Sequence, residues 1–225
     1  MRKFDCEEFS PAINTIKRLN VILDLDNTII NSLTISSELK KVPQDYQNKF
    51  KYHDMGNEYR IFERPYVQEF LDYLFIHFNV SIFTAADKEY ALFIYDNVIK
   101  KPNPERQIHY MFSGYHSSLS EILYNSPKNL KLLWDEFKIH QFKPCNTIIV
   151  DDLYEVYIEN RYNCVRAPKF ELLTKNRVNY NSHLDNFLIT KAIKDIEKYH
   201  LDLLNKPCLT HIQDSNSFKC NRITF

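Results

Sequence analysis

Glycine is scarce in this chain of 225 residues, in which only Gly56 and Gly114 occur. Walker A loops and GxGxxG dinucleotide loops each need several glycines at a fixed spacing, so neither loop can be present. If the protein handles phosphate, it must therefore do so by another device.

An excess of charge of either sign is also lacking, because 29 Lys and Arg balance 29 Asp and Glu. No overall basic field attracts the chain to nucleic acid or to an anionic membrane surface. No apolar run approaches the length that spans a bilayer, and the first residues, MRKFDCEEFS, are too acidic for a signal peptide. We therefore expect neither stable nucleic-acid binding nor a membrane partner.

Cysteine is sparse and irregularly placed. The five residues are odd in number and contain no CxxC pair: Cys6, Cys145, Cys164, Cys208 and Cys220. This pattern argues against a zinc site and favours free thiols in a reducing compartment. We therefore expect an intracellular protein, with the nucleus and the cytoplasm both open.

The apolar residues, 44% of the chain, support a folded core. Three short apolar runs, at 20–25, 79–83 and 147–150, are typical of strands buried on both faces of a parallel sheet. Helical patterns lie between them, at 64–78, 87–100 and about 126–137. Strands that alternate with helices predict an α/β fold with a doubly wound sheet.

The segment 31–62 interrupts this alternation. Residues 49–54 and 57–62 alternate loosely in polarity around Met55-Gly56 and predict a β-hairpin. A late amphipathic helix is expected at about 183–204, followed by a polar tail. We therefore divide the chain into an N-terminal extension (1–18), a domain (19–204) with a hairpin insertion (31–62), and a C-terminal tail (205–225).

Each apolar run ends in polar residues that can carry chemistry. The first ends in DLDNT (24–28), the second in Thr84, and the third in Asp151-Asp152. In open parallel sheets, ligands bind at the carboxyl ends of the strands. Carboxylates gathered there repel one another, raise one another's pKa, or hold a cation. Oxygen ligands without a His or Cys cluster favour a hard ion, most simply Mg²⁺.

Asp24 and Asp26 stand two residues apart, and a turn at the strand end can aim them differently. One aspartate can then attack phosphorus while the other serves as acid and base. Phosphoryl transfer also needs its negative charge neutralised, which calls for a lysine. Lys128 precedes the third strand and is the candidate, with Lys131 one helical turn further on as its competitor.

Four motifs, DLDNT, FTAA, PKNLKLLW and IIVDD, resemble those of the haloacid dehalogenase (HAD) superfamily. More narrowly, the chain is similar to the small carboxy-terminal-domain (CTD) phosphatases, which dephosphorylate Ser/Thr in proteins, including the tail of RNA polymerase II. This narrower resemblance rests on VILDLDNTIINS, on ERPYVQEFLDYL before VSIFTAADKEYA, and on KNLKLLW before IIVDD. It covers about residues 20–204 and implies a HAD-like parallel sheet, with helices on both faces and a small β-hairpin insertion after the first strand.

The resemblance also implies roles for individual residues. Asp24 would be the nucleophile that forms an aspartyl-phosphate, and Asp26 the general acid and base. Thr28 would support the loop, while Thr84 and Lys128 would hold the phosphate.

For the metal, the resemblance implies Mg²⁺ bound by Asp24, by the backbone carbonyl of Asp26 and by Asp152, with Asp151 close by. The sequence departs from the family pattern at three places. Asn27 occupies a position where Glu is usual, the segment 109–118 lacks an Arg that the family often has there, and Leu153 replaces a small polar residue after Asp151-Asp152.

The leading hypothesis is a Mg²⁺-dependent phosphatase that acts through an aspartyl-phosphate on phosphoserine or phosphothreonine, so that its partner is a phosphoprotein. A second keeps the fold but acts on a nucleic-acid 3′-phosphate or a small phosphometabolite. A third is a non-catalytic binding or scaffold protein. The zero net charge disfavours a nucleic-acid substrate, and the retained catalytic residues disfavour a scaffold.

Overall fold

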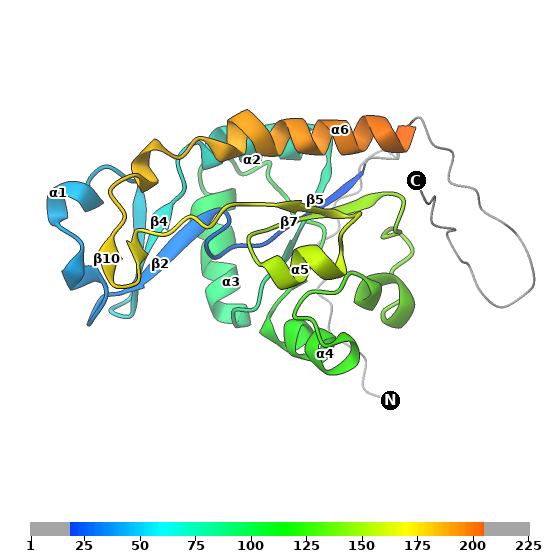
Figure 1. Cartoon of the computed structure of the whole chain (residues 1–225), viewed down its shortest axis with the longest axis horizontal. Coiled ribbons are helices and arrows are strands. Elements are labelled where there is room, and N and C mark those ends of the chain that lie inside the picture. Colours follow the sequence, from blue (N-terminus) through cyan, green and yellow to red (C-terminus); the bar gives the residue numbers. More distant parts are fainter. Residues whose placement is uncertain (1–18, 205–225) are drawn as a thin grey trace, which may run out of the picture.

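The computed structural model describes residues 19–204, so the predicted extension and tail lie outside the described residues (Figure 1). The strands are β1 (Asn20–Leu23), β2 (Ile30–Thr34), β3 (Tyr52–Met55), β4 (Tyr59–Glu63), β5 (Asn79–Phe83), β6 (Met111–Phe112), β7 (Thr147–Asp151), β8 (Cys164–Arg166), β9 (Leu173–Thr174) and β10 (Arg177–Val178). The α-helices are α1 (Gln44–Gln47), α2 (Val67–His77), α3 (Lys88–Ile94), α4 (Gly114–Tyr124), α5 (Tyr154–Glu159) and α6 (Ile193–Leu204).

A five-stranded parallel sheet forms the centre, in the order β6-β5-β1-β7-β8. The three predicted strands are its central members: β5 covers the predicted residues, β1 ends two residues early, and β7 extends one residue further. The predicted doubly wound α/β fold is therefore confirmed.

Alternate residues of the central strands pack against helices on opposite faces. Val21 and Leu23 share one buried cluster with residues of α2, α3 and α6, whereas Ile22 belongs to a second cluster that includes Val156 of α5. Figure 1 shows α2 and α6 on one side of the sheet and α4 and α5 on the other. Burial on both faces explains why these strands read as continuous apolar runs.

The predicted helices are formed to different extents. α2 and α3 lie where the sequence indicates them, and α3 continues as a π-helical segment, Tyr95–Lys100. The helix expected at 126–137 is shorter, because residues 126–130 form turns before a π-helical segment, Leu132–Glu136. Here the Ser120 hydroxyl accepts from Asn129 N, and the Asn129 side chain accepts from Lys131 N, so side chains replace helical acceptors.

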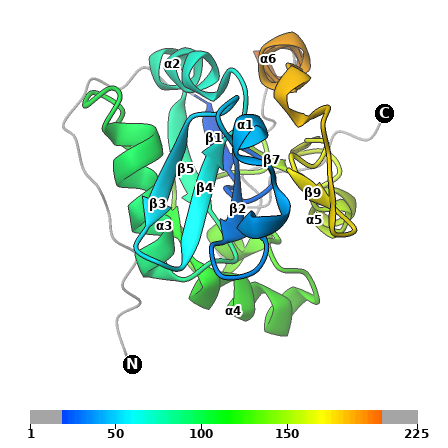
Figure 2. The same cartoon turned by 90° about the vertical axis from the view of Figure 1, so that its left-hand side faces the viewer.

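The insertion is larger than the predicted hairpin. The hairpin is β3–β4, with Gly56 at a positive φ of 56° in its turn, and β2 adds a third antiparallel strand in the order β2-β4-β3 (Figure 2). β2 lacks an apolar alternation because it buries the polar Asn31, whose side chain accepts from Leu172 N. This sheet has a small core of its own, which includes Phe50 and Phe62.

The structure also bears on two expectations from the sequence: that the cysteines are free thiols, and that no segment spans a membrane. Cys145 is disulfide-bonded and Cys164 is free, so the expectation of five free thiols is wrong at Cys145. Pairing depends on closeness in space, which spacing along the chain does not reveal.

Within residues 19–204, no helix has both the length and the apolar character needed to cross a bilayer.

Candidate active site

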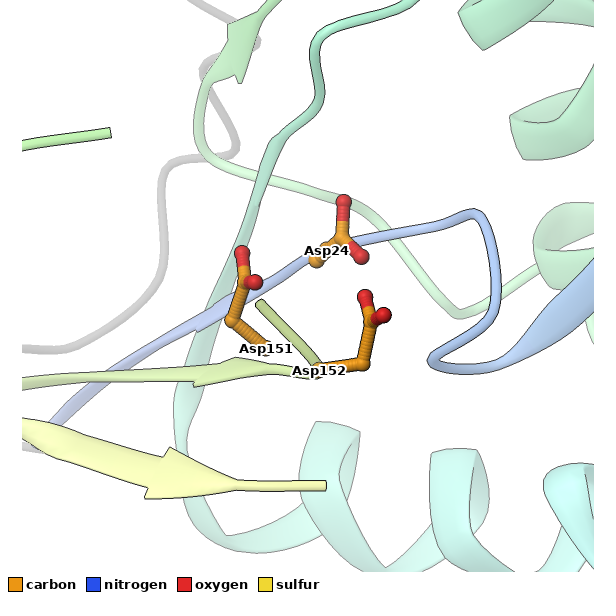
Figure 3. A group of neighbouring side chains, drawn as sticks. All are labelled: Asp24, Asp151 and Asp152. Carbon is orange, nitrogen blue, oxygen red and sulfur yellow. The ribbon is translucent and has the colours of Figure 1, made fainter. Parts of the chain in front are cut away.

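Three carboxylates meet at the carboxyl ends of β1 and β7. Asp24 follows β1, Asp151 ends β7 and Asp152 comes next, and one oxygen from each lies within 4.8 Å of the others (Figure 3). The parallel pairing aligns the two strand ends, since Asp24 N donates to Val150 O at 3.0 Å. All three residues are buried.

Lys128 is the buried cation of this cluster. Its Nζ donates to Asp24 Oδ1 at 2.5 Å and to Asp151 Oδ2 at 2.8 Å, and the residue is only 1% exposed. Burial lowers the pKa of Lys128, but Asp24 and Asp151 outweigh this effect and raise the pKa above its usual value. The side chain is therefore a fixed positive charge beside the candidate nucleophile, whereas its competitor Lys131 is exposed.

A buried amide holds the backbone around Lys128. Asn160 Nδ2 donates to Lys128 O at 2.9 Å, and Asn160 Oδ1 accepts from Leu130 N at 2.9 Å. No sequence pattern indicates this role, because a lone Asn at the end of a short helix is common.

The loop after β1 orients Asp24. Thr28 Oγ1, expected to support this loop, donates to Asp24 Oδ2 at 2.8 Å and lies 3.3 Å from Asp152 Oδ1. Asn27 has a positive φ of 60° and accepts from Asn31 Nδ2 through its side chain. Asn is among the residues that adopt this left-handed conformation most readily.

Asp26 occupies a different environment from Asp24. Its Oδ1 accepts from the Tyr90 hydroxyl at 2.5 Å, and the Ser32 hydroxyl lies at 3.5 Å. Burial raises the pKa of Asp26 to about 6, and the nearby charge of Asp24 adds to the shift. The Asp26 carboxylate is not one of the three clustered groups; the metal contact expected of this residue was through its backbone carbonyl.

The cluster suits a hard divalent cation. Asp152 Oδ2 is buried and accepts no hydrogen bond among the described residues, and the Lys169 ammonium lies 3.9 Å away. Burial and then Asp24 raise the pKa of Asp152 to about 6, and the same two causes raise that of Asp151. A cation would relieve this repulsion, and an all-oxygen donor set fits Mg²⁺.

Thr84 reaches the same edge of the sheet at the end of β5. It is buried, its N donates to Phe112 O at 2.9 Å, and its Oγ1 accepts from Ala86 N at 3.1 Å. The segment 109–118, which lacks the family Arg, forms β6 and the start of α4. The first residue of α4, Gly114, packs closely against the backbone that follows Thr84. A Cβ added at Gly114 would lie 2.8 Å from Ala85 O.

Comparison with known proteins identifies the family to which this chain is similar. The family model described as "NLI interacting factor-like phosphatase" matches residues 19–200. The CTD phosphatase-like protein 355R of Invertebrate iridescent virus 6 is 36% identical over 191 residues, which cover 81% of this chain and 99% of that protein. Protein 355R of Invertebrate iridescent virus 3 is also 36% identical, over 70% of this chain and 86% of that protein.

Two solved structures share the fold. Fission yeast RNA polymerase II CTD phosphatase Fcp1-R271A bound to beryllium fluoride has a TM-score of 0.52 and 20% identity, with coverage of 85% of this chain and 53% of that one. A second Fcp1 structure has a TM-score of 0.51 and 18% identity, with coverage of 89% and 56%. The present chain thus spans about half the length of the Fcp1 chains in these two structures.

Proposed function

Because the chain belongs to the NLI interacting factor-like phosphatase family, we propose that it is a Mg²⁺-dependent phosphatase that forms an aspartyl-phosphate on Asp24. The observation that carries the proposal is the contrast between two aspartates. Asp24 accepts from Lys128 and Thr28 within the carboxylate cluster, whereas Asp26 accepts from Tyr90 and its pKa is raised to about 6 by burial. Carboxyl groups in such different environments can divide the work of nucleophile and acid.

In the first step, an Asp24 oxygen attacks phosphorus as the bond from phosphorus to the leaving oxygen breaks. Asp26 gives its proton to that oxygen. In the second step, water attacks the phosphorus, Asp26 takes a proton from the water, and the Asp24 carboxylate is released.

Positive charge must balance the phosphoryl oxygens throughout. Lys128 supplies a fixed ammonium, and Thr84 supplies a hydroxyl from the neighbouring strand end. Asp24, Asp151 and Asp152, with the Asp26 carbonyl, would hold Mg²⁺, which would neutralise further charge on the phosphate when bound.

For the substrate we propose phosphoserine or phosphothreonine in a protein. The support is the CTD phosphatase-like name of the viral relatives and the RNA polymerase II CTD phosphatase title of the structural neighbours. A nucleic-acid 3′-phosphate is less favoured by the zero net charge. A scaffold without activity would not need a nucleophile, an acid and a buried lysine together.

The first test is hydrolysis of an aryl phosphate with and without Mg²⁺. We expect activity only with the metal, loss of the trapped phosphoenzyme in Asp24→Asn, and severely slowed turnover in Asp26→Asn. Full activity in excess chelator, or near-normal turnover of Asp24→Asn, would contradict the mechanism. A panel of phosphopeptides, 3′-phosphorylated oligonucleotides and sugar phosphates then separates the substrate classes.

A further inference from the structure

The proposed chemistry uses the hydrogen bond from Tyr90 to mark the environment of Asp26, but it gives Tyr90 no role of its own. Tyr90 lies in α3, six residues after Thr84, and is 8% exposed. Its hydroxyl donates to Asp26 Oδ1 at 2.5 Å and also forms a hydrogen bond with the Ser32 hydroxyl. Tyr90 and Ser32 both stand within the motifs that carry the family resemblance, yet neither was assigned a role from the sequence.

We infer that Tyr90, supported by Ser32, is a positioning residue for proton transfer by Asp26. The inference rests on the proposed function, in which Asp26 is the general acid and base. Hydroxyl donation to Oδ1 fixes the rotation of the carboxyl group. It also leaves Oδ2, which has no hydrogen bond among the described residues, as the oxygen that carries the proton.

The direction of these hydrogen bonds follows from counting protons. Tyr90 and Ser32 each have one hydroxyl proton, and a carboxylate oxygen can only accept. The hydrogen bond between Tyr90 and Asp26 therefore uses the phenol proton, which the Tyr90 hydroxyl donates to Asp26 Oδ1. Since the Tyr90 proton goes to Asp26, the hydrogen bond between the two hydroxyls needs the Ser32 proton, and Ser32 donates it to the nearby Tyr90 oxygen rather than to Asp26 Oδ1 at 3.5 Å. The result is a relay from Ser32 through Tyr90 to Asp26.

The relay is held between α3 and the insertion. Ser32 lies in β2, and the Tyr59 ring of β4 packs edge-on against the Tyr90 ring, with centroids 5.9 Å apart. The backbone N of Tyr90 donates to Asp87 Oδ1 at 2.8 Å, which caps α3. Both the ring and the backbone of Tyr90 are therefore fixed, as positioning of a proton donor requires.

The consequence concerns the leaving group. As the bond from Asp24 to phosphorus forms and the bond to the leaving oxygen breaks, Asp26 Oδ2 must deliver its proton to that oxygen. Phenol has a pKa close to that of tyrosine, about 10, and needs this proton. The more acidic p-nitrophenol leaves readily as an anion. Poor positioning of Asp26 should therefore slow phenyl phosphate far more than p-nitrophenyl phosphate.

The test is kcat/KM of Tyr90→Phe on this matched pair of substrates, because kcat/KM includes transfer of the phosphoryl group to Asp24. We expect a loss of about 10- to 100-fold on phenyl phosphate, since misplacement by about 1 Å can cost that much. The loss on p-nitrophenyl phosphate should be much smaller. Ser32→Ala should show the same preference to a lesser degree.

Tyr73→Phe is the control, because it removes a hydroxyl in α2 that donates to Glu197, away from the site. It should leave both substrates unchanged. If Tyr90→Phe lowers kcat/KM equally on both substrates, the role of Tyr90 is only structural. If it lowers kcat/KM on neither, Tyr90 has no part in the mechanism. Both outcomes overturn the inference.

Asp26→Asn separates this inference from the function on which it rests. If Asp26→Asn slows phenyl phosphate selectively and Tyr90→Phe does not, the positioning role alone fails. If Asp26→Asn shows no selectivity, the acid role of Asp26 fails, and the positioning role fails with it.

Discussion

Replacement of Lys128 by Met removes the ammonium of the site and keeps most of the side-chain volume. Lys131→Met is the matched control, since Lys131 is three residues away and exposed. In the native chain the Lys128 ammonium lies between Asp24 and Asp151, at 2.5 and 2.8 Å from their oxygens. The substitution therefore leaves two buried carboxylates without their cation.

The expected loss of stability follows from this geometry. Removal of one partner from a buried ion pair typically costs about 3–5 kcal/mol, because the other charge stays buried and unpaired. The loss should depend on pH. Burial and then Asp24 already raise the pKa of Asp151, while Lys128 opposes that shift, so the variant should raise this pKa further.

A carboxyl whose pKa is raised in the folded state binds protons that the unfolded state does not. The Lys128→Met protein should thus regain stability as the pH falls through the raised pKa of Asp151. Its free energy of unfolding should be lowest, relative to wild type, above that pKa. Urea unfolding of both variants without metal, at several pH values, measures this directly.

The expected loss of rate is separate from the loss of stability. Removal of one preorganised group that stabilises transition-state charge typically lowers kcat by about 10²–10³. We expect this loss in Lys128→Met on p-nitrophenyl phosphate at saturating substrate and Mg²⁺, with circular dichroism confirming the fold, and little change in Lys131→Met. If Lys128→Met is destabilised but keeps a normal kcat, the role of Lys128 is structural only. If the loss of kcat appears in Lys131→Met instead, the assignment of Lys128 as the phosphate-binding lysine is refuted.

Two other predictions concern the metal and the glycine beside Thr84. Burial and then Asp24 raise the pKa of Asp152 to about 6, so below that pH a proton competes with Mg²⁺. The affinity for Mg²⁺, measured by calorimetry, should be constant well above pH 6. Below pH 6 it should fall about tenfold per pH unit for each proton that Mg²⁺ displaces. An affinity that does not depend on pH would contradict this prediction. Gly114→Ala places a Cβ 2.8 Å from Ala85 O, so thermal unfolding should show a loss of about 1–3 kcal/mol, even though Ala favours a helix. Unchanged stability would mean that the loop after Thr84 can shift away from the added Cβ without cost.

The sequence predicted the central sheet and the strand ends because both depend on short-range patterns. A short continuous apolar run is typical of a strand buried on both faces, and the aspartates that follow it directly fall at the carboxyl end of that strand. The parallel topology then places Asp24 and Asp151 together, and the structure has them at the carboxyl ends of two adjacent strands. Their separation in sequence did not matter, since both strands end at the same edge of the sheet.

The relay at Asp26 could not be predicted in the same way. Tyr90 stands in a helix at a position that reads as ordinary core, and Ser32 stands in a strand without apolar alternation. Only the packing of the insertion against α3 brings their hydroxyls to Asp26. A hydrogen bond between residues 58 positions apart leaves no periodic trace in the sequence.

The late helix shows how the site alters structure far along the chain. The sequence predicts one helix at about 183–204, but the structure has a 3-10 turn (Ser182–Leu184), then Asp185, and helical structure again from Leu188. The Asp185 carboxylate accepts two hydrogen bonds from the buried Arg64 guanidinium, at 2.7 and 3.2 Å.

The third hydrogen bond of Arg64 goes to Thr28 O at 2.8 Å, inside the loop that orients Asp24. Arg64 is 1% exposed, and a buried guanidinium without a carboxylate would be costly. The extended backbone at Asp185 lets its side chain meet that charge, and Asp185 also accepts from Phe187 N. The helix is therefore interrupted at Asp185, where the chain pairs with Arg64, the cation that supports the Asp24 loop. Helical periodicity in the sequence cannot predict such an interruption, because it reports only the spacing of apolar residues.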